Sequence, residues 1–341
     1  MADKLRAVLV GCGSISGTWL NAAREIDDLE IAGLVDINDE AAKKRKEEYG
    51  LSAAVVGTEL ASVLDTVRPD VVFDCTVPEA HVSVTLAALE HGCHVLGEKP
   101  LADTMENARR MVEAAERSGR VYAVTQNRRY DPNIRALREF VASGRIGEIT
   151  TLNSDFYIGA HFGGFRDRME HVLLLDMAIH TFDQARLISG SDPVAVYCKE
   201  WNPKGSWYDH DASAVCVFEM SDGLIYTYRG SWCAEGLNTA WESWWRCVCE
   251  RGGVTWDGSE GFRAQAIVET GGFHSKWEDV DVPISDTEKR GSHAGLIRDF
   301  VRCIGSGDMP ETVCTDNIKS LAMVFGAIES AETGRRAEIR A

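Results

Sequence analysis

The first apolar run of the chain and the turn after it read Leu5-Arg6-Ala7-Val8-Leu9-Val10-Gly11-Cys12-Gly13-Ser14-Ile15-Ser16. The run predicts a buried strand, and the glycines predict a tight turn into a helix. Glycines at such a junction let the backbone approach a pyrophosphate held at the helix N-terminus. Ser16 replaces the third glycine of the usual pattern and is small enough for the same helix–strand contact. Taken alone, the motif also fits an ordinary glycine-rich turn.

A carboxylate at the end of the next strand supports the nucleotide interpretation. Asp36 follows a second apolar run about 25 residues after Gly11, near the ~20 expected for a carboxylate that accepts both ribose hydroxyls. The same charge repels a 2′-phosphate, and Ile37 and Asn38 offer no cation beside it. NAD is therefore expected, and NADP is disfavoured. The basic residues 43–45 on the following helix are interpreted as a solvated face.

The first 125 residues alternate apolar runs with amphipathic stretches, a pattern typical of strand–helix units in a parallel sheet. Strands are expected at residues 5–10, 31–35, 71–75, 94–96 and 121–124, and helices at residues 16–25, 40–49, 79–91 and 104–117. Gly50, Gly92 and Gly119 follow three of these helices, where a left-handed residue is wanted. Residues 1–125 therefore predict a doubly wound NAD-binding Rossmann domain.

The pattern changes after residue 125. Asp131-Pro132 is a strong helix start, and the helix should run to Ser143. Alternating segments then predict strands at residues 148–158, 194–200, 212–219, 223–231 and 244–249, and further helices are expected at residues 173–188, 295–304 and 315–331. Turns such as Ser221-Asp222-Gly223 are hairpin-like. Residues 126–341 therefore predict an α+β domain with a large, mostly antiparallel sheet.

Composition excludes several classes of partner. The net charge of −17, from 36 basic and 53 acidic residues, repels nucleic acid and anionic membranes. No apolar run reaches the ~18 residues that cross a bilayer. Residues 1–6 lead straight into the first strand, which leaves no room for a signal peptide, so we expect a cytoplasmic protein. Ten cysteines without a C-x-x-C pair indicate reduced core thiols, and no metal is expected.

Two more segments fall at the carboxyl edge of the predicted sheet, where open α/β sheets bind ligands. Cys75-Thr76-Val77-Pro78-Glu79-Ala80-His81 ends one strand and begins a helix, and Gly97-Glu98-Lys99-Pro100 ends the next strand. A lysine at this edge is well placed to donate to a substrate oxygen. Away from such a site, Lys99 would be an ordinary surface lysine.

These segments resemble the Gfo/Idh/MocA oxidoreductases, the glucose-fructose oxidoreductase and inositol dehydrogenase-like family. Residues 94–102 are similar to the family's E-K-P signature, and Asn127-Arg128-Arg129-Tyr130-Asp131-Pro132 is similar to its domain-crossing segment. The resemblance covers nearly the whole chain and is strongest before residue 190. It implies that Lys99 lies beside nicotinamide and substrate, and that Arg128 reaches the substrate pocket from the junction. A homodimer or homotetramer is implied by the same analogy, and an uncovered sheet face with aromatic residues would serve as its interface.

A third match is the segment from Leu174 to Asp183, which resembles the family's D-x-x-x-H-x-x-D helix. Asp176, His180 and Asp183 share one helical face at spacings of four and three, so a carboxylate and an imidazole can converge on one substrate. Without the family match, His180 would more often be a satisfied core residue.

The chemistry explains these residue types. Oxidising a secondary alcohol requires a base for the hydroxyl proton while hydride leaves the same carbon, and an imidazole suits that task. Asp176 can fix the imidazole tautomer or hold a neighbouring hydroxyl, and the Lys99 cation can stabilise the developing alkoxide. Eight of the nine tryptophans lie beyond residue 200, where they can stack on sugar rings or pack the sheet.

The expected site residues form three sets. The catalytic set is Lys99, Asp176 and His180. The cofactor-binding set is Gly11, Gly13, Ser14, Ile15, Asp36, Ile37, Thr76, Val77, Pro78, His81, Glu98, Lys99 and Arg128. The substrate set is Lys99, Arg128, Tyr157, Arg166, Asp176 and His180, with His161 and His171 as weaker candidates in the loop before the helix.

The function expected from these residues is NAD-dependent hydride transfer to or from a ring carbon of a sugar, glycoside, inositol or related polyol. One alternative is a dehydrogenase or reductase of a non-sugar such as a dihydrodiol or a tetrapyrrole. Another is a sensor that binds dinucleotide and sugar without turnover, although the intact Lys99, Asp176 and His180 argue against it.

Overall fold

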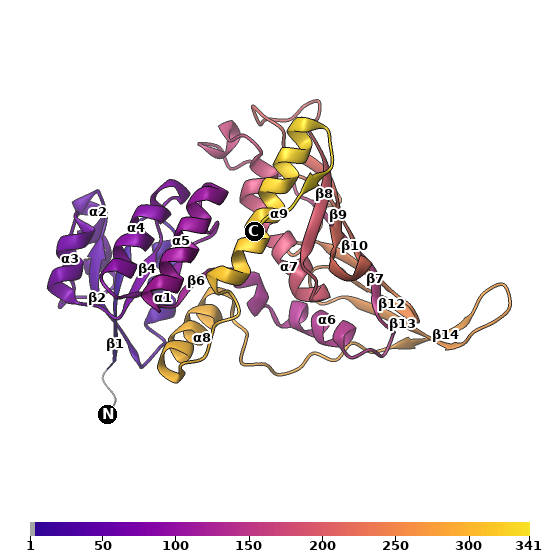
Figure 1. Ribbon diagram of the computed structural model, residues 1–341, viewed down its shortest axis with the longest axis horizontal. Helices are drawn as coiled ribbons and strands as arrows, with labels where there is room; N and C mark the ends of the chain where they lie inside the picture. The colour runs from indigo at the N-terminus through magenta and orange to yellow at the C-terminus, as the bar shows by residue number, and fades with distance from the viewer. Residues whose placement is uncertain (1–3) are drawn as a thin grey trace. The chain divides into compact units, whose positions relative to one another are not determined.

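The computed structural model describes residues 4–341 and forms two compact units (Figure 1). One unit contains the chain up to Tyr130 together with Glu288–Ile318, and the other contains Asp131–Thr287 together with Lys319–Ala341. The first boundary lies near the expected division at residue 125. The return of Glu288–Ile318 to the first unit is a difference from the expected division into residues 1–125 and 126–341. Residues 1–3 of the expected first domain lie outside the described part.

The first unit is built on a six-stranded parallel sheet in the order β3-β2-β1-β4-β5-β6. Its strands are β1 (Leu5–Val10), β2 (Leu29–Val35), β3 (Val55–Gly57), β4 (Val71–Asp74), β5 (His94–Gly97) and β6 (Tyr122–Val124). Its helices are α1 (Ser16–Ala23), α2 (Asp39–Glu48), α3 (Leu60–Val67), α4 (Pro78–Glu90) and α5 (Met105–Ser118). This order is that of a Rossmann fold, so the expected doubly wound domain is confirmed.

Helix α8 (Ser292–Ser306) completes the core of this unit although it lies far away in sequence. Its buried residues Leu296, Ile297 and Phe300 share one apolar cluster with Trp19 and Leu20 of α1. The short 3-10 helix Asn127–Tyr130 follows β6 and also contributes Tyr130 to this cluster. The apolar face of α8 is therefore buried against α1.

The second unit contains a nine-stranded sheet in the order β14-β13-β12-β11-β7-β10-β9-β8-β15. Its strands are β7 (Ile149–Tyr157), β8 (Pro193–Trp201), β9 (Ser213–Met220), β10 (Ile225–Ser231), β11 (Trp244–Cys249), β12 (Gly252–Trp256), β13 (Phe262–Glu269), β14 (Lys276–Val280) and β15 (Ala337–Glu338). Among the described strands of this second sheet, only β7 and β10 pair in parallel, and the other neighbours are antiparallel. The expected mostly antiparallel sheet is confirmed.

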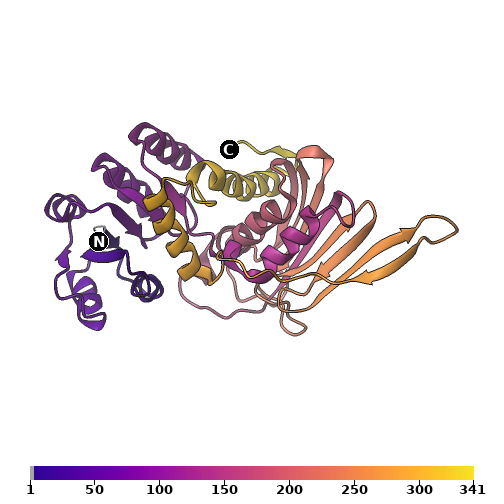
Figure 2. The same cartoon turned by 90° about the horizontal axis from the view of Figure 1, so that it is seen from below.

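Three helical segments cover one face of this sheet, as both views show (Figures 1 and 2). They are α6 (Pro132–Ala142), a π-helical turn (Leu173–Ala178) that continues into α7 (Ile179–Ser189), and the later part of α9 (Cys314–Thr333). Asp131 caps α6 by accepting hydrogen bonds from the Asn133 and Ile134 N–H groups. Buried and more exposed residues alternate along β7, β9 and β11, so only one face of these strands is buried.

All ten cysteines are unpaired, and all but Cys198 and Cys233 are buried. None of the helices between residues 4 and 341 is long and apolar enough to cross a membrane. Within the same range, no group of three or more His, Cys, Asp and Glu side chains is arranged to hold a metal ion.

Candidate active site

The glycine-rich turn after β1 has the geometry of a nucleotide cradle. Gly11 has a φ of +88°, and a Cβ on it would lie 2.7 Å from the Cys75 backbone, so only glycine fits. A Cβ on Gly13 would meet open space. Ser16 is buried and its hydroxyl donates to the Gly13 carbonyl at 2.6 Å, which braces the turn. The N-terminus of α1 has no side-chain cap, so its first N–H groups suit a pyrophosphate.

Asp36 lies directly after β2, beside this turn. Its carboxylate accepts the Cys12 N–H at 2.7 Å and the Asn38 N–H at 2.8 Å. A carboxylate has about four acceptor positions, so two remain for ribose hydroxyls. Ile37 follows with a fully exposed side chain. The residues present therefore fit an adenosine dinucleotide at this edge of the sheet.

Arg45 departs from the expected solvated face of α2. Its guanidinium donates to the Gly13 carbonyl at 2.8 Å and to the Cys12 carbonyl at 3.4 Å, and it pairs with Glu48. Lys44 is exposed as expected, with only a 3.7 Å ion pair to Glu48. Arg45 therefore braces the glycine-rich turn, which residue spacing alone did not indicate.

The segment after β4 closes on a buried pair. His81 is 1% exposed, and its Nδ1 lies 2.9 Å from Asp74 Oδ2, while the Thr76 hydroxyl donates to Asp74 Oδ1. Burial lowers the pKa of His81, but the Asp74 charge outweighs burial and raises it overall. Val77 is exposed and Pro78 opens α4. Thr76, Val77 and Pro78 thus line the edge, whereas His81 lies beneath it.

The segment after β5 carries Glu98 and Lys99. Glu98 is buried; it accepts the Trp19 indole N–H at 2.7 Å and the Lys99 backbone N–H at 3.2 Å. Lys99 is half-buried, and its peptide bond to Pro100 is cis. In the junction motif, Arg128 is half-buried, but Arg129 and Tyr130 are buried and bind Asp316 and Asp299. The junction motif therefore anchors the returning segment Glu288–Ile318.

In the second unit, the π-helical turn presents Asp176 and α7 begins with His180 in its first turn. The sequence predicted one regular α-helix here; π-helical turns are frequent at functional sites. Asp176 accepts two hydrogen bonds from Arg166, at 2.8 Å from Nε and 3.3 Å from Nη2. Both Asp176 and His180 are half-buried. The structure therefore joins Arg166 to Asp176, two residues of the predicted substrate set.

Sequence reasoning missed the support around Arg166. Its guanidinium lies over the rings of Phe162 and Phe165, with 5.0 and 4.8 Å to the ring centroids. Tyr208 donates to the Ala160 carbonyl at 2.7 Å, which ties the loop before the π-helical turn to the loop between β8 and β9. Burial, with Asp176 among the nearby charges, raises the pKa of Tyr208 to about 12. An isolated Tyr208 in an irregular segment gave no sequence signal.

Three other predicted contacts lie elsewhere in this unit. Tyr157 falls on the same face of β7 as Asp155, opposite buried Phe156, so it points to the face away from the covering helices. His161 stacks on Trp207 and pairs with Glu235 at 3.0 Å. His171 pairs with buried Glu200 at 2.6 Å. None of these contacts involves Asp176, and a substrate role for the three residues stays a prediction.

Asp183, the last residue of the helix motif, has a structural environment. It is 1% exposed and accepts the Ser320 hydroxyl at 2.7 Å, and Ser320 also accepts from Arg186 at 2.9 Å. These contacts fasten α7 to α9. The motif therefore combines two half-buried residues with one that holds the helix in place.

Comparison with known proteins decides the family. The model of the oxidoreductase family with an NAD-binding Rossmann fold matches residues 5–126, and the Gfo/Idh/MocA C-terminal domain model matches residues 134–255. The chain belongs to the Gfo/Idh/MocA oxidoreductases. It is therefore an enzyme of the oxidoreductase class, and its cofactor is NAD.

Named relatives share nearly the full length. The chain is 25% identical to D-apiose dehydrogenase from Paraburkholderia graminis, across 99% of this chain and 90% of the relative. It is 26% identical to inositol 2-dehydrogenase from Streptomyces avermitilis, across 98% and 94%. An Agrobacterium radiobacter oxidoreductase, solved with NAD+, L-tartaric acid and magnesium, shares the fold with a TM-score of 0.85 at 22% identity and 98% coverage of both chains.

Proposed function

We propose that this Gfo/Idh/MocA oxidoreductase oxidises a secondary alcohol of a sugar, glycoside, inositol or related polyol, or reduces the corresponding ketone. The observation that carries the proposal is the Asp176–His180 pair on one helical segment, with Asp176 oriented by a two-point contact to Arg166. Its relatives named as apiose and inositol dehydrogenases support the substrate class.

Three side chains take the roles that this reaction requires. NAD, when bound, supplies the hydride acceptor. His180 removes the hydroxyl proton, and the Lys99 ammonium stabilises the negative charge that develops on the oxygen. Asp176, held by Arg166, orients the imidazole or accepts a hydrogen bond from a vicinal hydroxyl. These roles make Lys99, Asp176 and His180 the reacting centre of the proposal.

The other predicted site residues are assigned to binding of the cofactor or the substrate. We assign the adenosine ribose to Asp36 and the pyrophosphate to the turn at Gly11, Gly13, Ser14 and Ile15, with Ile37, Thr76, Val77, Pro78 and Glu98 along the same edge. Arg128 and Arg166 are assigned to substrate hydroxyls or carboxylates, because a guanidinium is a planar multiple donor. We also propose that the first domain binds the cofactor, and that the second domain binds the substrate and forms the oligomer.

A substrate panel tests the reaction. Sugars, inositols, keto-glycosides and a dihydrodiol are offered with NAD and with NADP, and nicotinamide absorbance is followed. We expect turnover with a sugar or polyol and with NAD. Turnover of the dihydrodiol alone would contradict the substrate class, and NAD binding without any turnover would favour a sensor.

Two variants separate cofactor binding from chemistry. Asp36→Ser with Ile37→Arg should lose the preference for NAD, because the carboxylate is replaced and a cation is added. Lys99→Ala should keep NAD affinity but lower kcat by at least about 10²-fold, whereas Lys44→Ala should change neither. Near-normal kcat in Lys99→Ala would overturn the assigned role.

A further inference from the structure

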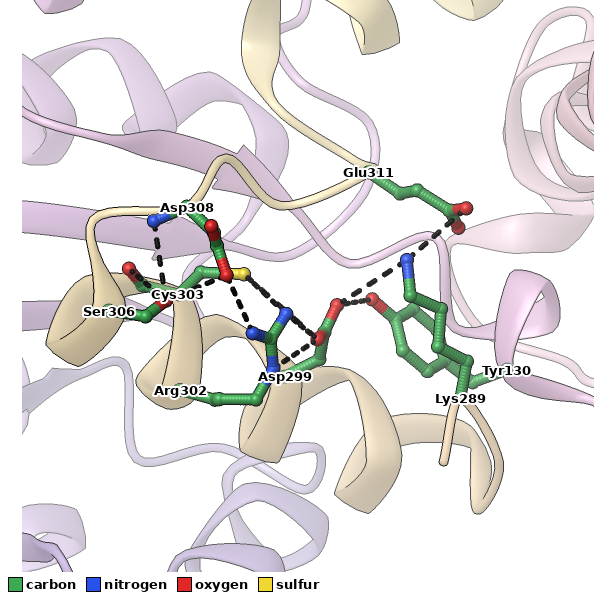
Figure 3. A network of polar contacts seen from close by, with 8 residues as sticks. All are labelled: Tyr130, Lys289, Asp299, Arg302, Cys303, Ser306, Asp308 and Glu311. Atoms are coloured by element: carbon green, nitrogen blue, oxygen red, sulfur yellow. Dashed lines mark hydrogen bonds and ion pairs between the residues drawn. The ribbon is translucent and has the colours of Figure 1, made fainter. Parts of the chain in front are cut away.

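Helix α8 belongs to the cofactor-binding unit through a network at its C-terminal half (Figure 3). Asp299 accepts the Tyr130 hydroxyl at 2.7 Å and an Arg302 N–H at 2.9 Å. Lys289 bridges this carboxylate, at 3.9 Å, to Glu311 at 3.2 Å. Together with the apolar contacts to α1, these bonds fix α8 against the Rossmann core.

The fixed helix carries His293 in its first turn. His293 Nε2 lies 3.6 Å from Glu98 Oε1, the oxygen that accepts the Trp19 indole N–H. The Asn127 amide donates to the hydroxyl of neighbouring Ser292 at 2.8 Å, which holds the start of the helix to the junction motif. His293 is 20% exposed and Glu98 is 11% exposed, counting side chains. An imidazole from a distant part of the sequence is thus placed on the carboxylate that precedes Lys99.

Glu98 needs such a neighbour. Burial raises the pKa of this carboxyl, but the contacts from His293, Trp19 and Lys99 outweigh burial and hold it below its usual range. A buried carboxylate stays charged only when it is paired and hydrogen-bonded. Its other oxygen accepts the Lys99 backbone N–H. The carboxylate therefore joins α1, α8 and the Lys99 backbone at one point.

We propose that His293 is a positioning residue for Lys99: with Trp19 it fixes the Glu98 carboxylate, and that carboxylate fixes the backbone and charge environment of Lys99. The inference rests on the proposed function of Lys99. It adds a residue from outside the three sequence motifs of the site. Other charged groups around the pair are Asp74 and His81, and the Cys75 thiol is buried beside them.

The Trp19 indole gives a readout that does not require turnover. In 15N-labelled protein without NAD, the Trp19 indole N–H signal, assigned by Trp19→Phe, is compared between wild type and variants at one fixed pH. We expect its chemical shift to change clearly in His293→Gln, because the carboxylate oxygen that accepts this N–H loses its imidazole neighbour. The exposed His91→Gln is the matched control and should leave the signal where it is in the wild type. An unchanged indole signal in His293→Gln would overturn the proposal.

Kinetics then test the path through Glu98. His293→Gln should lower kcat about 10- to 100-fold, because a small displacement of a catalytic group has effects of this size, with KM for NAD changed less than threefold. If His293 acts through Glu98, the double variant His293→Gln with Glu98→Gln should lose no more kcat than the more damaging single variant. A double variant whose loss of kcat equals the product of the two single losses would contradict this path. If the wild type shows no turnover, the proposed function fails, while the indole chemical shift still decides whether His293 controls Glu98.

Discussion

Arg45 is a single side chain that holds the glycine-rich turn after β1 in shape. It binds two carbonyls of that turn, whereas neighbouring Lys44 points to solvent. We predict that Arg45→Ala weakens NAD binding about tenfold, since hydrogen bonds from a charged donor contribute roughly 1.5–3 kcal/mol. Lys44→Ala should change affinity less than twofold. Calorimetric titration with NAD measures both, and equal effects of the two variants would refute a bracing role for Arg45.

The buried Asp74–His81 pair should make stability depend on pH. Because the pKa of His81 is raised in the folded protein, the pair's contribution is fully present below the unfolded value of about 6.5 and is lost as pH rises through the higher folded value. His81→Gln should therefore cost on the order of 1 kcal/mol more unfolding free energy at pH 6 than at pH 9. Denaturant unfolding at both pH values, with His91→Gln as the control, measures it. A larger loss at pH 9 would show that the sign is wrong.

At the residue scale, the sequence predicted where a residue lies in the fold better than which side chain it contacts. Asp36 follows its strand as expected, because a strand end and a glycine turn are local patterns. His81 was expected to contact cofactor, but it is buried against Asp74, seven residues away in sequence. The Arg166–Asp176 contact was likewise not predicted, because it depends on how an irregular loop folds back on the helix.

At the scale of elements, the D-x-x-x-H-x-x-D motif spans the π-helical turn and α7, and its residues serve two different functions. Asp176 and Asp183 lie on the same helical segment, but Asp183 is 1% exposed and holds α9 through Ser320. We predict that Asp183→Ala lowers the free energy of unfolding by about 2–4 kcal/mol, because it leaves a buried donor without its acceptor. Asp176→Ala should cost about 1 kcal/mol or less while it abolishes most turnover. Thermal unfolding and kinetics on both variants test this. A stable Asp183→Ala with little turnover, beside a destabilised but active Asp176→Ala, would contradict the assignment.

The predicted elements were right where periodicity is strong and length sufficient. β1 has the expected bounds, and α4, α5 and α6 differ from expectation by a residue or two. The three-residue β3 was missed because it is too short to show a period, and α3 was missed although its apolar residues follow a helical spacing. The β12–β15 strands were also missed. Their pairing depends on contacts along the sheet rather than on local sequence.

For the whole molecule, the nine-stranded sheet bears on assembly. Tyr197, Val217, Ile225 and Val248 are exposed apolar residues of β8 to β11, and large apolar patches often mark interfaces. We predict a homodimer or homotetramer formed through these strands. Val217→Lys with Ile225→Lys should lower the mass measured by light scattering, whereas Ile284→Lys, in the loop after β14, should not. A monomeric wild type would contradict this prediction.

The first unit includes a segment that is distant from it in sequence. Glu288–Ile318 lies between β14 and β15 of the nine-stranded sheet in sequence, yet Asp299 and Asp316 bind Tyr130 and Arg129 of the first unit. Such a return is fixed by buried contacts between distant segments, so no local pattern indicates it. The Rossmann order, in contrast, follows from regularly alternating elements.

The pH dependence of oxidation tests the central claim most directly. With the substrate that the panel identifies, kcat/KM is measured across pH for the wild type and for His180→Ala. The account predicts that the wild-type rate falls at low pH as the imidazole protonates, and that His180→Ala loses this limb together with roughly 10²- to 10⁴-fold in rate. A His180→Ala enzyme that keeps the acidic limb and a near-normal rate would contradict it.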